Sequence, residues 1–124
     1  MKKNNEMIEL LIPEEGLVLY PGTIYIGRTI ERTETKGLVP CINGKSSVGR
    51  LGISIHATAG FGDIGFEGFW TLEIFVIQPV RVYPGVRIGQ LYYEEADGEI
   101  TSTYEGKYQN NTGAEGSKYF KNFK

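Results

Sequence analysis

The chain concentrates side chains that can do chemistry in residues 44–52 and 63–73. The first stretch reads Gly-Lys-Ser-Ser-Val-Gly-Arg-Leu-Gly, so two hydroxyls and two cations lie between glycines. Backbone N–H groups at a glycine turn that opens a short helix, together with such side chains, can cradle phosphate oxygens. The stretch is not a nucleotide P-loop, because Val39 stands where that motif has its upstream glycine. A solvated turn is the alternative interpretation.

Glu73 is the acidic residue that most needs an explanation, because it lies within the apolar stretch 69–77. Strand alternation gives this stretch two apolar faces, Trp70, Leu72, Ile74 and Val76 on one and Thr71, Glu73, Phe75 and Ile77 on the other. An unpaired carboxylate in the interior costs several kcal/mol or takes up a proton. We therefore expect Glu73 to have a cationic or hydrogen-bonding partner, with Arg50 as the natural candidate. A barrel rim or a wetted sheet face is an equally open alternative for Glu73.

Short β-strands are the elements that must position these residues. Segments rich in Val, Ile, Leu and Tyr, separated by Gly or Pro, predict strands over 7–12, 17–20, 24–30, 38–42, 53–56, 69–77, 80–83 and 88–93. The pattern indicates an all-β barrel or jelly roll. One helical turn is expected over residues 46–51, where a serine can cap the exposed N–H groups.

Length and composition limit the chain to one β domain and a tail. Its 124 residues can bury one core, which we place in residues 1–95. Residues 96–124 are polar, show no strand pattern and are expected to be mobile unless something binds them. Eight tyrosines and six phenylalanines are many for a single small core, so we expect some of them to lie between subunits.

The net charge of −2 gives no basic surface for nucleic acid or for an anionic membrane. The first residues are polar and lead into only a short apolar run, which is typical of neither a signal peptide nor a membrane span. We therefore expect a cytoplasmic protein that binds neither nucleic acid nor membranes. Cys41 is the only cysteine, so we expect a small buried residue and no disulfide.

Several motifs follow one another with consistent spacing: residues 44–60, residues 63–68, the pair Leu72-Glu73, residues 83–91 and, in the tail, residues 104–113. Together they resemble the dCTP deaminase branch of the superfamily of dCTP deaminases and trimeric dUTPases. The resemblance implies a distorted jelly-roll or β-barrel of the dUTPase-like type and a homotrimer with active sites at subunit interfaces. It also implies a short form without the family's usual N-terminal region, and a magnesium-bound deoxynucleoside triphosphate as ligand.

The resemblance implies catalytic roles for four residues, namely Glu73, Arg50, Ser46 and Ala59. Glu73 matches the glutamate that activates water for attack on C4 of cytosine and carries protons to the leaving ammonia. Arg50 matches the arginine that holds this machinery in place, and Ser46 lines the same pocket. The backbone of Ala59 matches a group that helps to position the water.

The same resemblance implies nucleotide contacts from Lys45, Ser47, Thr58, Asp63, Phe66, Gln90, Tyr104, Lys107 and Asn111. Asp63 matches the aspartate near the sugar 3′-hydroxyl, which in dUTPases activates the water that attacks phosphorus. Phe66 matches the ring that packs on the deoxyribose and leaves no room for a 2′-hydroxyl. Tyr104, Lys107 and Asn111 belong to a tail that closes over the nucleotide, with Lys107 facing phosphate.

Metal chemistry is restricted by the composition. Zinc-dependent nucleobase deaminases need a Cys-x-x-Cys pair beside a His or Cys ligand, and this chain has one cysteine and one histidine, His56. Deamination by this chain therefore requires a carboxylate base held by a cation, which Glu73 and Arg50 supply. We expect no zinc and no metal ligand from the protein, and Mg²⁺ bound mainly through the triphosphate. His56 is expected to be structural.

Three functions are compatible with these residues. The first is a dCTP deaminase that makes dUTP and ammonia with a Glu-activated water and without zinc. The second is a dUTP diphosphatase that uses Asp63, or an enzyme that carries out both steps and so makes dUMP. The third is a catalytically impaired homologue that binds nucleotide or regulates a partner.

Overall fold

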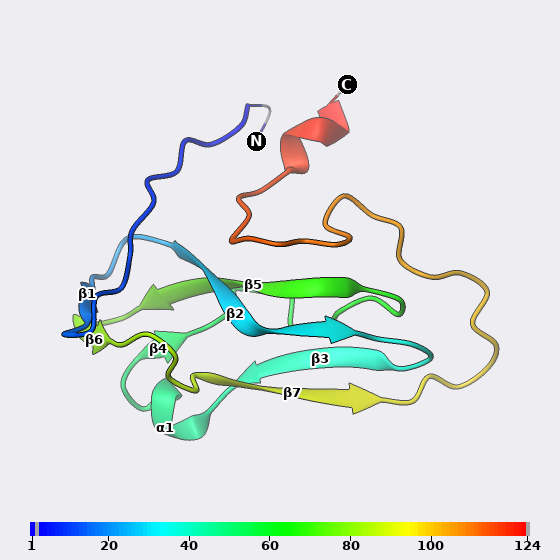
Figure 1. The fold of residues 1–124 in the computed structure, drawn as a ribbon, viewed down its shortest axis with the longest axis horizontal. Coiled ribbons are helices and arrows are strands. Elements are labelled where there is room, and N and C mark those ends of the chain that lie inside the picture. Colours follow the sequence, from blue (N-terminus) through cyan, green and yellow to red (C-terminus); the bar gives the residue numbers. More distant parts are fainter. Residues whose placement is uncertain (2, 124) are drawn as a thin grey trace.

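The fold is built from short antiparallel strands (Figure 1). The computed structural model describes residues 1 and 3–123. The described residues form the strands β1 (Leu17–Leu19), β2 (Tyr25–Glu34), β3 (Val39–Gly44), β4 (Ile53–Ser54), β5 (Glu67–Val76), β6 (Val80–Val82) and β7 (Gly89–Glu94). A single helical turn, α1 (Ser46–Gly49), and a 3-10 turn, Tyr119–Phe123, complete the secondary structure. The predicted all-β class and the helical turn within residues 46–51 are confirmed.

The strands pair as β1–β6, as β2–β5–β4 and as β3–β7. In Figure 1 the β2–β5 pair lies over the β3–β7 pair, with β1 and β6 at one end. The β2–β5 ladder runs from Tyr25 opposite Ile74 to Glu34 opposite Glu67, and its register shifts between Arg28 and Arg32. Within this shift the hydroxyl of Thr29 accepts the backbone N–H of Trp70 at 3.0 Å.

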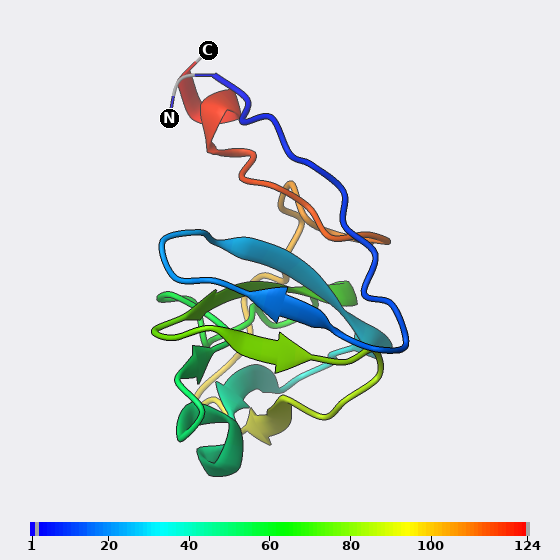
Figure 2. The ribbon, with the colours of Figure 1, turned by 90° about the vertical axis from the view of Figure 1, so that its left-hand side faces the viewer.

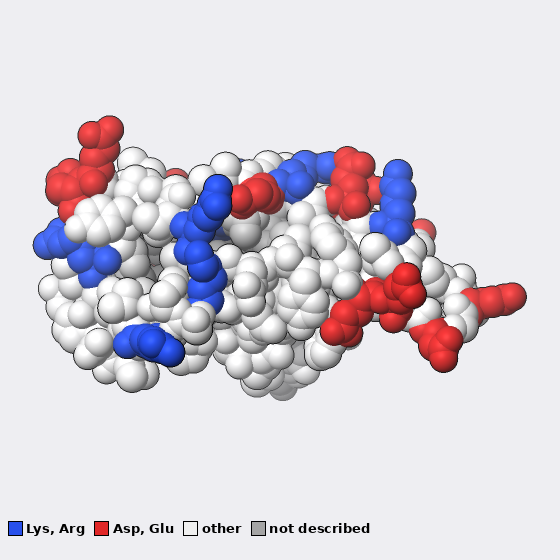
Figure 3. All heavy atoms as spheres, turned by 90° about the horizontal axis from the view of Figure 1, so that it is seen from below, with Lys and Arg blue, Asp and Glu red and all other residues white. Residues whose placement is uncertain are grey.

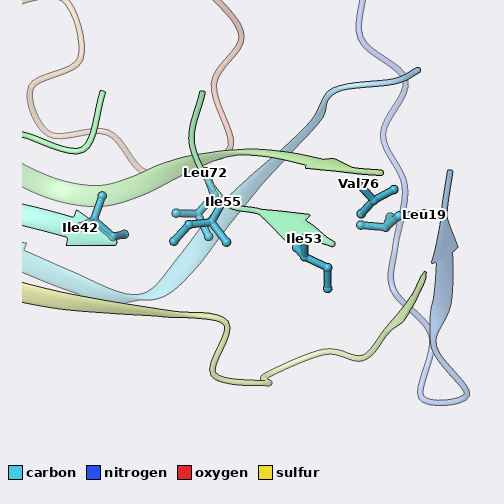
Figure 4. Packing of buried hydrophobic residues seen from close by; sticks show 6 residues of the cluster. All are labelled: Leu19, Ile42, Ile53, Ile55, Leu72 and Val76. Atoms are coloured by element: carbon cyan, nitrogen blue, oxygen red, sulfur yellow. The ribbon is translucent and has the colours of Figure 1, made fainter. Parts of the chain in front are cut away.

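The core lies between these two layers (Figure 4) and consists of Leu19, Ile42, Ile53, Ile55, Leu72 and Val76. Trp70 and Ile74, which are partly buried, pack against it. Leu72, Val76, Trp70 and Ile74 belong to the same face in the predicted alternation, and the structure turns this face toward the core. Ile55 is the most deeply placed aliphatic side chain of the cluster, with 1% of its surface exposed.

Truncating Ile55 to alanine should lower the free energy of unfolding by about 3 kcal/mol, because the site is closed on all sides and leaves a cavity. Chemical denaturation at one fixed protein concentration measures this loss. Ile100→Ala is the matched control, because Ile100 is 43% exposed and its truncation should cost less than about 0.5 kcal/mol. Equal losses in both variants would mean that Ile55 is not part of the core.

One predicted strand is wrong. Residues 7–12 form no strand, and their apolar side chains are exposed, with Ile8 at 88% and Leu11 at 83%. The segment runs away from the sheets toward the C-terminal turn (Figure 2), so no edge of a sheet lies beside it to complete a ladder. Met7 instead approaches Gly116, where an added Cβ would lie 2.9 Å from the methionine sulfur.

None of the described helices is long and apolar enough to cross a membrane.

Candidate active site

Glu73 lies in the middle of β5, opposite Ile26 of β2, and is half-buried. Its backbone N–H donates to the carbonyl of Ile55 at 3.0 Å. Its carboxylate oxygen Oε2 accepts a hydrogen bond from the backbone N–H of Ala57, also at 3.0 Å. The predicted hydrogen-bonding partner of Glu73 therefore exists, and it is a backbone group just beyond the end of β4.

A short turn beside Glu73 carries two of the predicted site residues. Ala57 begins this turn and is tied to Glu73, and Gly60 ends it, where its carbonyl accepts the N–H of Ile42 at 2.7 Å. Thr58 and Ala59 lie exposed between these two anchors. Thr58 and Ala59 therefore lie on a turn whose first residue is bonded to the Glu73 carboxylate.

Arg50 does not reach Glu73 within one chain. The carbonyl of Gly52 accepts the N–H of Ile77 at 3.0 Å, which places the residues before β4 beyond the far end of β5. At roughly 3.3 Å per residue, Ile77 lies about 13 Å along the strand from Glu73. Arg50 is exposed and forms no ion pair with any described residue. The predicted pairing of Arg50 with Glu73 is therefore wrong for a single chain, because the β4–β5 register separates them.

The helical turn α1 presents its hydroxyls differently from the prediction. The N-cap of α1 is Lys45, which has an extended backbone and makes no side-chain capping hydrogen bond. Ser46 is the first helical residue, so it does not act as the expected cap. Both Ser46 and Ser47 are exposed, and Lys45 is half-buried. Lys45, Ser46, Ser47 and Arg50 thus lie together at and around α1, separate in this chain from Glu73.

A second predicted site element is the turn of residues 63–66. The N–H of Phe66 donates to the carbonyl of Asp63 at 3.1 Å, and Gly65 has a φ of +88°, which favours glycine. Thr35 holds the turn from outside, because it donates to the carbonyl of Phe66 and accepts from the N–H of Gly65, each at 3.1 Å. The side chain of Asp63 is left exposed at the surface.

The ring of Phe66 makes two edge-to-face contacts. Its centroid lies 5.5 Å from that of Trp70 and 6.0 Å from that of Tyr104. Trp70 is not among the predicted site residues, because its place on the inner face of an apolar strand indicates a core residue only. Its neighbourhood with Phe66 depends on a turn that no local pattern reveals.

The tail packs against this turn and against the edge of β5. Tyr104 donates its N–H to Ile64 at 2.8 Å, and the N–H of Asn110 donates to the carbonyl of Glu67 at 2.8 Å. The side chain of Gln109 donates to the carbonyl of Gly65 at 2.8 Å and accepts the N–H of Glu67 at 2.9 Å. Gln109 is thus an anchoring residue that the predicted site does not include, although it lies within one of its motifs.

Of the other residues predicted to contact the nucleotide, Asn111 and Lys107 bond within the described chain, and Gln90 is exposed. Asn111 is 5% exposed, and its amide donates to the carbonyl of Phe69 at 3.2 Å and to the hydroxyl of Thr71 at 3.0 Å. Lys107 donates to the side chain of Asn122 at 3.0 Å. Gln90 is exposed on β7.

Metal-binding side chains do not gather in the part of the chain that the structure describes. No group of three or more His, Cys, Asp or Glu residues lies close enough there to hold a metal ion. His56 follows β4, and its buried ring nitrogen Nδ1 has no hydrogen-bond partner among residues 1 and 3–123.

The strand-rich fold agrees with the family indicated by the sequence motifs. The chain belongs to the dCTP deaminase-like family, whose model matches residues 1–96. A relative from Hathewaya histolytica named "dCTP deaminase, dUMP-forming" is 60% identical over 123 residues, which are 99% of this chain and 72% of that protein. Relatives of the same name from Clostridium acetobutylicum and Leptospira biflexa are 54% and 58% identical, over 99% of this chain and 71% of each relative. The predicted family is confirmed.

Proposed function

We propose that this chain is an enzyme that hydrolyses dCTP, removes the 4-amino group as ammonia and releases dUMP and diphosphate. Support comes from its family and from relatives 54–60% identical that are named for this reaction. We propose dUMP as the product in place of the expected dUTP, because dUMP is the product in the relatives' name. The structural observation that carries the proposal is the hydrogen bond that holds the Glu73 carboxylate to the N–H of Ala57.

Because of this hydrogen bond, the two carboxylate oxygens of Glu73 have different roles. Oε2 is held by the backbone, which fixes the orientation of the carboxylate. Oε1 has no hydrogen-bond partner among the described residues, so it is free to accept a proton from water. The resulting hydroxide adds to C4 of cytosine, and the C–N bond then breaks. The proton held by Glu73 goes to the departing nitrogen, so that ammonia leaves, and the proton of the added hydroxyl moves to N3 as the uracil carbonyl forms.

A second water completes the reaction to dUMP. It adds to the α-phosphorus of dUTP, and the bond from that phosphorus to the bridging oxygen breaks to release diphosphate. Asp63 is the base proposed for this water, because its exposed carboxylate lies on the turn that also carries Phe66. Phe66 packs on the deoxyribose between the two reacting ends. Mg²⁺ is carried by the triphosphate, and no protein side chain is assigned to it.

The active enzyme is proposed to be a homotrimer whose sites are shared between subunits. One argument is the distance between Glu73 and Arg50 within a chain, which a neighbouring copy can close. Another is the apolar surface, since Ile77, Phe61 and Ile30 are 77%, 74% and 69% exposed. A broad part of one face also carries no charged side chain (Figure 3). Ser46, Ser47, Lys45 and Arg50 of one copy would then face Glu73 of the next.

The tail is proposed to close over the bound nucleotide. Its anchors on Gly65, Glu67 and Phe69 keep Tyr104 beside Phe66, where the sugar would lie. Lys107 would have to leave Asn122 to reach a phosphate group. Such a closure excludes water other than the reacting molecules and strengthens the electrostatic interactions inside.

Product analysis tests the proposed function. The purified chain, incubated with Mg²⁺ and either dCTP or dUTP, should give dUMP and diphosphate from both nucleotides and ammonia only from dCTP, as measured by ion-exchange chromatography and an ammonia assay. Formation of dUTP as the end product would leave a deaminase without the second step. Conversion of dUTP alone would identify a diphosphatase. Absence of turnover together with nucleotide binding would favour the impaired homologue.

A further inference from the structure

Trp70, the only tryptophan of the chain, packs against both ends of the turn that carries Asp63 and Phe66. At one end, a Cβ added to Gly62 would come within 2.4 Å of the indole atom Cη2. The backbone just before Asp63 therefore rests directly on the indole ring. At the other end, the indole meets the ring of Phe66 edge-to-face, with 65° between the two planes.

Two threonines of β2 hold Trp70, one through its indole and one through its backbone. Its Nε1–H donates to the hydroxyl of Thr33 at 3.0 Å, and the backbone N–H of Trp70 donates to the hydroxyl of Thr29 at 3.0 Å. Thr29 lies within the shift in the β2–β5 register between Arg28 and Arg32, and Thr33 lies just after it. With both N–H groups bound and the ring packed against the core, Trp70 forms a rigid support.

Phe66 is thus held from two sides by elements of different kinds. Trp70 belongs to the central strand β5, whereas Tyr104 belongs to the tail. If the tail moves when a nucleotide enters or leaves, the contact with Tyr104 changes, but the contact with Trp70 does not. Trp70 therefore determines the position of the Phe66 ring independently of the tail.

We infer that Trp70 is a positioning residue that fixes the ring of Phe66 and thereby sets the preference of the site for deoxyribose over ribose. The inference rests on the proposed function, in which Phe66 packs on the sugar of the nucleotide. A 2′-hydroxyl adds one oxygen where the ring lies. A ring that can retreat admits this oxygen, whereas a ring held against an immobile indole excludes it, because close-packed groups tolerate little added volume.

Binding measurements in the Glu73→Gln background test this role without turnover. The ratio of the dissociation constants for CTP and dCTP, measured by calorimetry, should fall about tenfold in Trp70→Leu, which loses an aromatic contact and a hydrogen bond. The fall should come mainly from tighter binding of CTP. Trp70→Phe, which keeps an aromatic ring, should retain most of the preference. Tyr83→Leu, a change of an exposed aromatic residue elsewhere, should leave the ratio unaltered.

Thr33→Val is a second test that does not depend on the folding of Trp70→Leu. It removes only the acceptor of the indole N–H, and it should lower the ratio a few-fold while the thermal midpoint changes little. An unchanged ratio in both Trp70→Leu and Thr33→Val would overturn the inference. The protein with Glu73 intact tests the proposed function separately. If it prefers dCTP but releases no ammonia from it, the proposed function fails, and the ratio of dissociation constants still decides the role of Trp70. If the parent binds neither nucleotide, both are wrong.

Discussion

Replacing Glu73 with glutamine is expected to reduce ammonia release from dCTP about a thousandfold while leaving the fold intact. Glutamine has the same shape, and its carbonyl oxygen can still accept the N–H of Ala57, so the turn beside β5 should stay in place. The amide cannot take a proton from water, however, and so cannot make the nucleophile or return a proton to the leaving nitrogen. An ammonia assay under saturating dCTP measures the loss.

Glu67→Gln provides the matched control for this experiment. Glu67 lies on the same strand, its side chain is 34% exposed, and its carboxylate lies 3.6 Å from the guanidinium of Arg32. Loss of such a partly exposed ion pair costs little, so activity should stay within a few-fold of the parent. Deamination by Glu73→Gln at a rate close to that of the parent would rule out Glu73 as the base. A loss of binding, seen as a missing thermal shift with dCTP, would instead indicate a role in holding the nucleotide.

The part of the site that sequence predicts correctly is local. Alternation along residues 69–77 predicts which residues share a face of β5, and Leu72 and Val76 of one such face are both buried. The same reasoning requires a partner for Glu73 and correctly includes a hydrogen bond among the possibilities. The identity of the partner depends on the register between β4 and β5. A shift of a few residues would change which group faces the carboxylate, and this register pairs residues that are distant in the chain, Ile53 with Val76 and Ser54 with Phe75.

Contacts between distant segments account for the remaining differences. Gln109 and Asn111 bind groups about forty residues earlier in the chain, and a polar tail without periodicity gives no sign of such bonds. Residues 7–12 show the opposite case, because their apolar pattern is typical of a strand but no sheet edge of the same chain is available to them. Trp70 packs against the core and also contacts Phe66, and the apolar pattern of its strand indicates only the first of these two contacts.

Mixing two inactive variants is expected to restore activity if Arg50 and Glu73 meet between subunits. Arg50→Ala should be inactive alone, because the carboxylate and the water lose their cation, and Glu73→Gln is inactive for the reason given above. In a cyclic trimer each site takes Glu73 from one copy and Arg50 from its neighbour. In trimers reassembled from equal amounts of the two variants, about a quarter of the sites should then receive both intact residues. The ammonia assay should show a corresponding recovery.

The control for this mixture replaces Arg50→Ala with the double variant that carries both changes. No copy in that mixture supplies an intact Glu73, so no site can be complete and no activity should return. Light scattering, with differently tagged copies, establishes that mixed trimers have formed in both samples. Mixed trimers without recovery would place Arg50 and Glu73 in sites built by one chain. The structure argues against this, because the residues before β4 lie beside Ile77, about 13 Å along the strand from Glu73. A fully active monomer would contradict the shared site directly, because a single copy could not supply both halves of it. The apolar residues exposed on β2 and beyond the end of β5 would then also have no neighbour to cover them.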